Sequence, residues 1–191
     1  MWRETQKPSG GLLADDMGLG KTLTMISLVL KSKELNLDTK DKENHGEKEP
    51  GGTLVVCPAS LIYQWSEAIK RRTKRGLLSV KVHHGTKHET KPKGLAEHDI
   101  VITSYTIIMN ENSRDGAAFG VHWRRIILDE AHQIRNHTSK TSEAICRLSG
   151  KSRWALTGTP VDNKELDMYA IFKFLRCSPF DDLHVSFFFC F

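Results

Sequence analysis

A glycine-rich turn that ends in Gly-Lys-Thr constrains this sequence more than any other feature. The turn covers residues 15–22 and separates two apolar runs, at residues 10–14 and 23–30. The first run predicts a short buried strand, and the second, which is apolar nearly all round, predicts a buried helix. A strand, a glycine-rich turn and a helix in this order are typical of a phosphate-binding loop. The segment therefore predicts a site for a nucleotide phosphate at the start of the helix.

The residue types in the turn suit a bound phosphate. Gly18 and Gly20 lack a Cβ, so the backbone can bend sharply and approach a phosphate closely. The first amides of the helix have no intrahelical partner and lie at the positive end of the helix dipole, which favours an anion. Lys21 is expected to reach the β- and γ-phosphates, and the Thr22 hydroxyl to hold Mg²⁺. The predicted nucleotide-binding residues are Asp15, Asp16, Met17, Gly18, Leu19, Gly20, Lys21 and Thr22.

One position departs from the full phosphate-loop pattern G-x-x-x-x-G-K-[ST], because Asp15 replaces its first glycine. The alternative interpretation is a surface turn followed by a core helix. The Gly-Lys-Thr end and its strand–helix context favour the phosphate loop over that alternative.

A second segment, residues 125–130, supports the same prediction. It is an apolar strand that ends in two carboxylates, Asp129 and Glu130. Ligands of a doubly wound sheet bind at the carboxyl ends of its strands. Asp129 is therefore predicted to be the second Mg²⁺ ligand, and Glu130 to polarise the attacking water. An Asp-Glu pair often simply ends a strand, and it is the pairing with the phosphate loop that favours the functional interpretation.

Three motifs together resemble the helicase-like ATPases of the Swi/Snf type. Residues 15–22 match the first motif of that family, whose members also lack the first glycine. Asp129-Glu130-Ala131-His132 matches the second motif, and Leu156-Thr157-Gly158-Thr159-Pro160 matches the third. DEAH-type RNA helicases share the second motif but typically carry Ser-Ala-Thr in the third, so the resemblance favours double-stranded DNA translocases. It covers nearly all of residues 10–183.

The resemblance implies a DNA-dependent ATPase that uses ATP and Mg²⁺, with Lys21 and Glu130 as catalytic residues. It also implies a coupling group that links the nucleotide state to the grip on DNA. That group is His132, Thr157, Gly158 and Thr159. The predicted contacts with double-stranded DNA are at Pro58, Thr103 and Ser104.

Within the family, residues 167–181 are similar to the transcription termination factor branch. This similarity implies a role in termination, RNA polymerase or chromatin proteins as partners, and a nuclear location, with a cytoplasmic one as the alternative.

The predicted fold is α/β, because predicted strands and helices alternate along the chain. We expect a RecA-like lobe over residues 1–185, with a mostly parallel sheet and helices on both faces. The charged residues 31–52 predict an extension of the first helix followed by a disordered insert. The apolar residues 186–191 form an atypical tail. A second motor lobe, which supplies arginine fingers in the family, is expected to be absent, so a hydrolysis-incompetent nucleotide- and DNA-binding fragment is an alternative.

Composition sets wider limits. The formal charge of +5 over 191 residues permits a polyanionic partner without requiring one. The four cysteines are scattered without metal or disulfide spacing, which favours a reducing compartment. The chain has no apolar run of 18 residues, so no membrane span is expected.

Several further elements can be predicted from local patterns. Residues 53–57 are typical of a buried parallel strand. Ser60 is expected to cap a helix whose apolar face includes Ile62, Trp65 and Ile69. The basic run at residues 70–75 suits either a helix C-terminus or DNA phosphates. Two more helices are expected, at residues 139–148 and 163–175.

Overall fold

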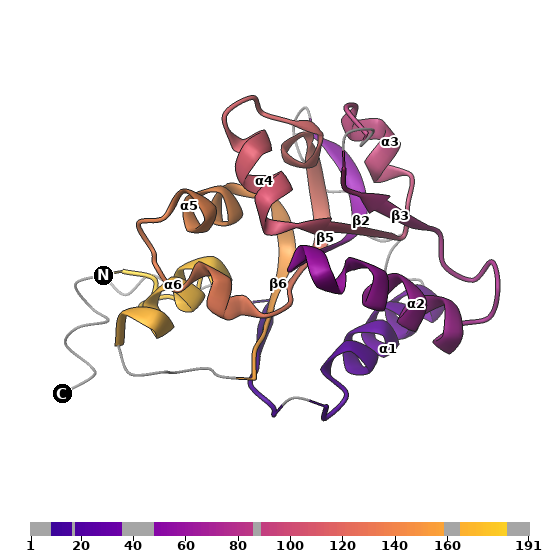
Figure 1. Cartoon of the computed structure of the whole chain (residues 1–191), viewed down its shortest axis with the longest axis horizontal. Coiled ribbons are helices and arrows are strands. Elements are labelled where there is room, and N and C mark those ends of the chain that lie inside the picture. The colour runs from indigo at the N-terminus through magenta and orange to yellow at the C-terminus, as the bar shows by residue number, and fades with distance from the viewer. Residues whose placement is uncertain (1–8, 17, 36–47, 86–88, 159–164, 183–191) are drawn as a thin grey trace.

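The computed structural model describes residues 9–16, 18–35, 48–85, 89–158 and 165–182, and Figure 1 shows the chain as a cartoon. Its strands are β1 (Gly10–Leu13), β2 (Glu49–Cys57), β3 (Val80–His83), β4 (Ile100–Ser104), β5 (Val121–Leu128) and β6 (Gly150–Leu156). Its α-helices are α1 (Lys21–Glu34), α2 (Ile62–Arg72), α3 (Pro92–Ala96), α4 (Tyr105–Asn112), α5 (Lys140–Arg147) and α6 (Glu165–Leu175). Short 3-10 helices occur at Ala59–Leu61, Ala117–Gly120 and Ala131–Ile134.

The strands form one six-stranded sheet in the order β1-β6-β5-β2-β4-β3. Every neighbouring pair is parallel. Because parallel strands share one direction, their carboxyl ends meet at a single edge of the sheet. The expected α/β fold with a parallel sheet is therefore confirmed.

Helices cover both faces of this sheet, as predicted (Figure 1). Alternate residues of a strand point to opposite faces, and in β2 both sets are buried. Leu54 and Val56 pack into a core with α3 to α6, whereas Val55 and Cys57 pack into a second core with α1 and α2. This two-sided burial explains why the strands consist of continuous apolar runs rather than alternating ones.

Strand β2 begins earlier than predicted. Glu49 lies opposite Val121, and Gly51 lies opposite Trp123 on β5. The prediction of an insert through residue 52 was therefore wrong for residues 49–52, whereas Lys31–Glu34 extend α1 as expected. The rest of the predicted insert lies in residues 36–47, which are outside the described residues, as is the tail at residues 186–191.

The predicted helices occur with shifted starts. Ser139 caps α5, because its hydroxyl accepts a hydrogen bond from the Ser142 amide at 3.1 Å. The predicted cap at Ser60 was wrong: Ser60 lies within the 3-10 turn Ala59–Leu61, and α2 follows from Ile62 without a side-chain cap. In the ranges that the structure describes, none of the helices has the length and hydropathy needed to cross a membrane.

Candidate nucleotide site

The sheet topology brings the three predicted motifs to one edge. Strand β6 lies between β1 and β5, with Leu156 opposite Leu13 and Ala155 opposite Leu128. The Thr157 amide continues this register by donating to the Leu13 carbonyl at 3.2 Å. The turn after β1, the Thr157 segment after β6 and the Asp-Glu pair after β5 therefore leave the sheet side by side. This edge is the usual ligand site of an open α/β sheet.

The turn after β1 has the conformation that its glycines allow. Gly18 and Gly20 have φ angles of 89° and 85°, in the left-handed region that residues with a Cβ rarely adopt. Helix α1 starts at Lys21 without a side-chain cap, so its first amides remain available to an anion. Leu19 beside them is 67% exposed. Met17 lies outside the described residues.

The Lys21 ammonium folds back over this turn. Its Nζ donates to the Asp15 carbonyl at 2.6 Å and to the Asp16 carbonyl at 3.0 Å. Thr22 follows in the first helical turn and is half-buried. Burial raises the pKa of the Asp129 carboxyl overall, and its electrostatic interaction with Lys21 offsets part of that rise. The two residues that the sequence assigned to one site therefore share an environment, although they lie on different strand ends.

Asp129 is held by hydrogen bonds from several elements. The Trp65 indole Nε1 on α2 donates to Oδ2 at 2.7 Å, and the Glu130 amide donates to Oδ1 at 3.0 Å. The Tyr105 hydroxyl, at the start of α4, donates to the Asp129 carbonyl at 2.9 Å. The Asp129 amide donates to the Val56 carbonyl at 2.8 Å. The backbone of Asp129 is therefore held by β2 and α4, and its carboxylate by α2 and by the next amide of the chain.

Burial makes the charge of Asp129 costly. Burial raises the pKa of its carboxyl, and so does the adjacent Glu130 charge, whereas the Trp65 hydrogen bond and Lys21 lower it. Burial, together with the Asp129 charge, also raises the pKa of Cys57 to about 12, so this neighbouring thiol stays neutral. A buried carboxylate gains from a cation, and carboxylate and hydroxyl oxygens are ligands that Mg²⁺ prefers. Asp129 and Thr22 therefore fit the predicted magnesium ligands.

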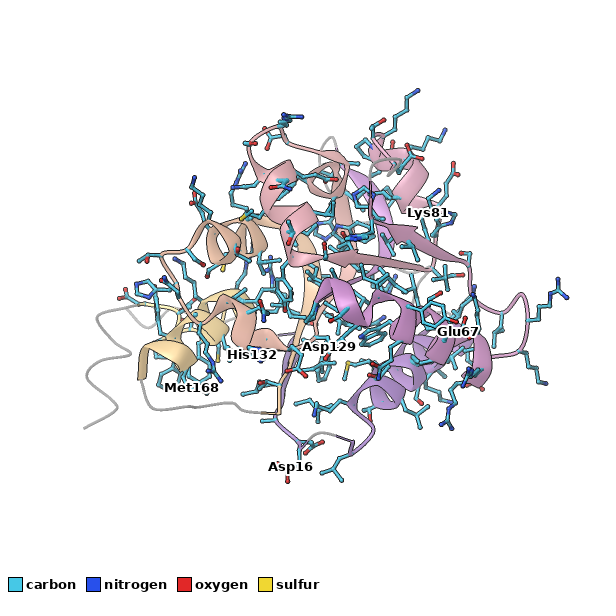
Figure 2. All side chains as sticks on the ribbon, in the orientation of Figure 1. Asp16, Glu67, Lys81, Asp129, His132 and Met168 are labelled. Carbon is cyan, nitrogen blue, oxygen red and sulfur yellow. The ribbon has the colours of Figure 1, made fainter. Side chains whose placement is uncertain are left out.

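Glu130 has an unusual backbone conformation. Its φ and ψ angles are 51° and 54°, in the left-handed region, where it precedes the 3-10 turn Ala131–Ile134. Its Oε2 lies 3.1 Å from Nδ1 of His132. The Glu130 side chain therefore lies beside His132 directly after the strand. Figure 2 labels Asp129 and His132 together with Asp16 of the phosphate loop.

The structure describes three of the four residues of the predicted coupling group. Thr157 is fully buried between the ends of β1 and β5, and Gly158 follows it half-exposed. His132 contacts Glu130 and, at 3.3 Å, the Gln133 side chain. Thr159 lies outside the described residues. Coupling through these residues stays a prediction.

The predicted DNA-contacting residues lie at the same edge: Pro58 follows β2, and Thr103 and Ser104 are the last two residues of β4. Pro58 is half-buried and precedes the 3-10 turn that leads into α2. Thr103 and Ser104 are 0% and 1% exposed, and the Ser104 hydroxyl caps α4 by accepting from the Ile107 amide at 3.4 Å. Contact of these two hydroxyls with DNA would require them to become accessible, and it stays a prediction.

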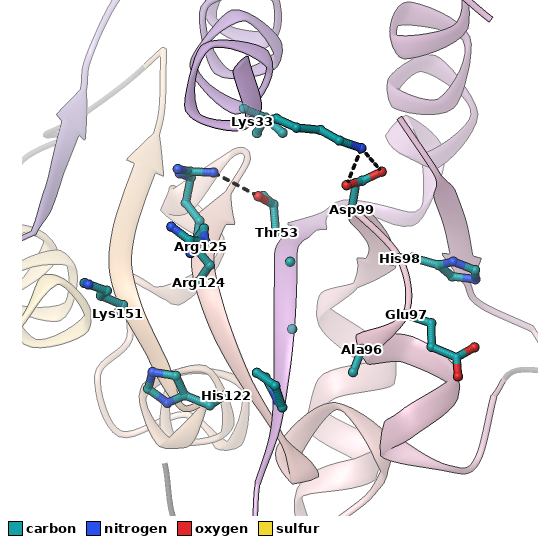
Figure 3. Close-up of a pocket in the computed structure, with 14 residues that line it drawn as sticks. Lys33, Thr53, Ala96, Glu97, His98, Asp99, His122, Arg124, Arg125 and Lys151 are labelled. Carbon is teal, nitrogen blue, oxygen red and sulfur yellow. Dashed lines mark hydrogen bonds and ion pairs between the residues drawn. The ribbon is translucent and has the colours of Figure 1, made fainter. Parts of the chain in front are cut away.

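A separate cavity lies at the opposite edge of the sheet (Figure 3). It has a volume of about 240 Å³ and includes residues at the start of β2 and before β4. Arg125 in its wall donates to the Thr53 and Ser32 hydroxyls, both at 3.1 Å. Lys33 on α1 pairs with Asp99 at 2.8 Å. The cavity lies at the amino ends of β2 and β4, whereas the phosphate loop lies at the carboxyl end of β1. This cavity is therefore not the nucleotide site.

Sequence reasoning missed the residues that hold Asp129. Trp65 was predicted only as part of an apolar helix face, and no role was predicted for Tyr105. Both are buried, at 2% and 6% exposed, and each carries one polar group. A buried Trp or Tyr needs a hydrogen-bond partner, but the pattern of the sequence does not say which one.

Comparison with known proteins agrees with this geometry. The model of the SNF2-related domain matches residues 1–188. Transcription termination factor 2 of Drosophila melanogaster is 54% identical, over 96% of this chain and 20% of that protein. DNA repair protein RAD5A of Arabidopsis thaliana is 36% identical, over 91% of this chain and 21% of its own length.

A solved structure is also similar. The Sulfolobus solfataricus SWI2/SNF2 ATPase core in complex with dsDNA is 34% identical, with a TM-score of 0.70, and the match covers 89% of this chain and 32% of that one. This chain therefore spans about a fifth of the first curated relatives' length and about a third of the solved core. The matched length, the parallel sheet and the three motifs at its edge agree, and the chain belongs to the SNF2-related domain family.

Proposed function

We propose that this chain is the ATP-binding lobe of a DNA-dependent ATPase that translocates on, or remodels, protein–duplex DNA complexes. One observation carries the proposal: the strand ends bring the Lys21 turn and the Asp129–Glu130 pair to one edge, where Lys21 and Asp129 interact electrostatically. The lobe extends over residues 1–185 in this proposal. A triphosphate between these two strand ends would contact the free amides at the start of α1.

Each residue has a distinct task in this arrangement. Lys21 exchanges its contacts with the Asp15 and Asp16 carbonyls for the β- and γ-phosphates of ATP. Thr22 and Asp129 would hold a magnesium ion, which would supply charge neutralisation at the phosphates. Glu130 orients the attacking water and accepts its proton, and Nδ1 of His132 lies 3.1 Å from Oε2 of that carboxylate.

Duplex DNA is the proposed second ligand. A structure 34% identical to this chain is described as a complex with dsDNA, and the formal charge of +5 is compatible with a polyanion. The third motif, Leu156–Pro160, favours DNA over the RNA that a DEAH-type helicase would bind. We place the task in transcription termination in the nucleus, with RNA polymerase or chromatin proteins as partners, because the 54% identical relative is a termination factor.

Substitution of Lys21 tests the nucleotide site directly. We expect Lys21→Ala to weaken binding of Mg-ATP by about 10- to 100-fold, since a hydrogen bond to a charged group contributes about 1.5–3 kcal/mol. Isothermal titration calorimetry measures the affinity. Lys31→Ala is the matched control, because Lys31 lies on the same helix but pairs with Glu34 in solvent. Equal affinities for the two variants would overturn the proposal.

A further inference from the structure

Trp65 makes an unusual contact for a core tryptophan. Its side chain is 2% exposed and packs between α2 and the sheet, yet its Nε1 donates to a carboxylate, Oδ2 of Asp129, at 2.7 Å. The partner lies at the nucleotide edge of the sheet, 64 residues away in the sequence. The helix that carries Trp65 thus reaches directly into the proposed metal site.

We propose that Trp65 is a positioning residue that sets the orientation of the Asp129 carboxylate for its metal ion. The inference rests on the proposed function, since it takes Asp129 as a magnesium ligand. An indole has one donor and no acceptor, so it can hold a carboxylate oxygen without competing for the cation. Partners of this kind behind a metal ligand orient it, and their removal typically weakens metal binding 10- to 100-fold.

The other hydrogen bonds of Asp129 do not tie its carboxylate to a second element, so Trp65 determines the orientation of the carboxylate. The Tyr105 hydroxyl and the Val56 carbonyl hold only the backbone of Asp129. Of the two carboxylate oxygens, Oδ1 accepts from the next amide in the chain, at Glu130, whereas Oδ2 accepts from Trp65. The Glu130 bond moves with the local backbone, so the indole is the contact that ties the carboxylate to another element.

The chain provides a matched control for a purely structural role. Trp123 is also buried, at 0% exposed, and its Nε1 also donates a hydrogen bond, to the Ala118 carbonyl at 3.0 Å. Trp65→Phe and Trp123→Phe therefore remove the same ring and the same kind of donor from the core. The two variants differ in which acceptor loses its hydrogen bond: the Asp129 carboxylate in Trp65→Phe, and the Ala118 carbonyl in Trp123→Phe.

The test measures Mg²⁺ and nucleotide binding separately in this chain. With a fluorescent ATP analogue, we expect Trp65→Phe to raise the Mg²⁺ concentration for half-maximal tight binding by about 10-fold, with affinity in EDTA unchanged. Trp123→Phe should leave both quantities at the wild-type values. An equal Mg²⁺ requirement in the two variants, with nucleotide binding intact, overturns the inference alone. Failure of the wild-type chain to bind the analogue with Mg²⁺ would instead overturn the proposed function.

A second measurement uses the wild-type chain and so does not depend on the folding of a variant. The four tryptophans give separate indole signals in a ¹⁵N–¹H spectrum. When Mg²⁺ is added to the chain saturated with ATP, the Trp65 signal should shift while the Trp123 signal stays in place. A Trp65 signal that does not move would contradict the inference.

Discussion

At the scale of single residues, Glu130 combines a strained backbone with a proposed catalytic role. A residue with a Cβ in the left-handed region costs about 1–2 kcal/mol relative to the right-handed one, and only glycine adopts it freely. The chain nevertheless has a glutamate there, with φ 51° and ψ 54°. Such strain persists where the surroundings enforce it, and it is found most often at functional sites.

This strain can be measured by comparing two substitutions that both remove the carboxylate. We expect Glu130→Gly to be more stable than Glu130→Ala by about 1 kcal/mol, because only glycine relieves the left-handed conformation. Urea denaturation gives both free energies of unfolding. Since each variant loses the His132 contact, the difference isolates the backbone. Because glycine costs more unfolded-state entropy than alanine, an unstrained site would make Glu130→Ala the more stable variant, and that outcome would contradict the strain.

At the scale of elements, the sequence predicted those strands and turns that have a recognisable pattern of residue types. The apolar runs of β2 and β5 and the glycine turn before α1 were recognisable because burial on both faces and left-handed glycines have simple sequence signatures. The start of β2 was missed because Glu-Pro-Gly-Gly is typical of a loop. In the structure Gly51 is required in the strand, since a Cβ there would lie 2.3 Å from Cγ1 of Val121.

Contacts between distant elements could not be predicted in the same way. The Ser60 cap failed because a 3-10 turn, rather than α2, follows Pro58. The Trp65–Asp129 bond depends on how α2 packs across the sheet, and the helical period fixes only which face is apolar.

One further link of this kind joins α1 to two strands at the opposite edge of the sheet. Asp99 precedes β4 and accepts hydrogen bonds from Lys33 on α1 at 2.8 Å and from the Ser79 amide before β3 at 2.7 Å. Figure 3 shows the Lys33 pair. Burial raises the pKa of Asp99, but the hydrogen bonds from Lys33 and Ser79 outweigh it, so the pKa lies below its ordinary value.

The lowered pKa of Asp99 gives its contribution a definite pH dependence. Its stabilisation is present above the unfolded-state pKa, about 3.9, and is lost as the pH falls through the lower folded-state pKa. We expect Asp99→Asn to lower the free energy of unfolding by about 1 kcal/mol at pH 7, a value reduced for solvent screening, and by less at pH 3.

Urea titrations at both pH values measure this difference for Asp99. Asp115→Asn is the control, because Asp115 pairs with Arg147 at 3.0 Å but is 79% exposed. It should change the free energy of unfolding little at either pH. A loss for Asp99→Asn that is the same at pH 3 as at pH 7 would contradict this account.

At the scale of the whole molecule, those groups of the proposed site that lie in the described residues come from one side. The phosphate loop, the Asp129–Glu130 pair and the Thr157 segment all leave the same edge of one sheet, and Gly18 and Gly20 of that loop are exposed. Phosphoryl transfer in such ATPases gains about 10³- to 10⁵-fold in rate from an arginine finger. This chain matches only about a third of the length of the solved SWI2/SNF2 core.

We therefore expect the 191-residue chain to bind Mg-ATP but to hydrolyse it slowly, with no increase on addition of duplex DNA. Lys21, Asp129 and Glu130 can bind and orient the reactants, but these three groups do not include an arginine finger for the charge that develops on the γ-phosphate in the transition state. A phosphate-release assay with and without duplex DNA at low salt measures turnover, and calorimetry on the same sample confirms that nucleotide is bound. Strong DNA-stimulated turnover, abolished by Glu130→Gln, would show that the chain completes the site by itself, whereas slow turnover with intact binding assigns the missing charge to another segment or partner.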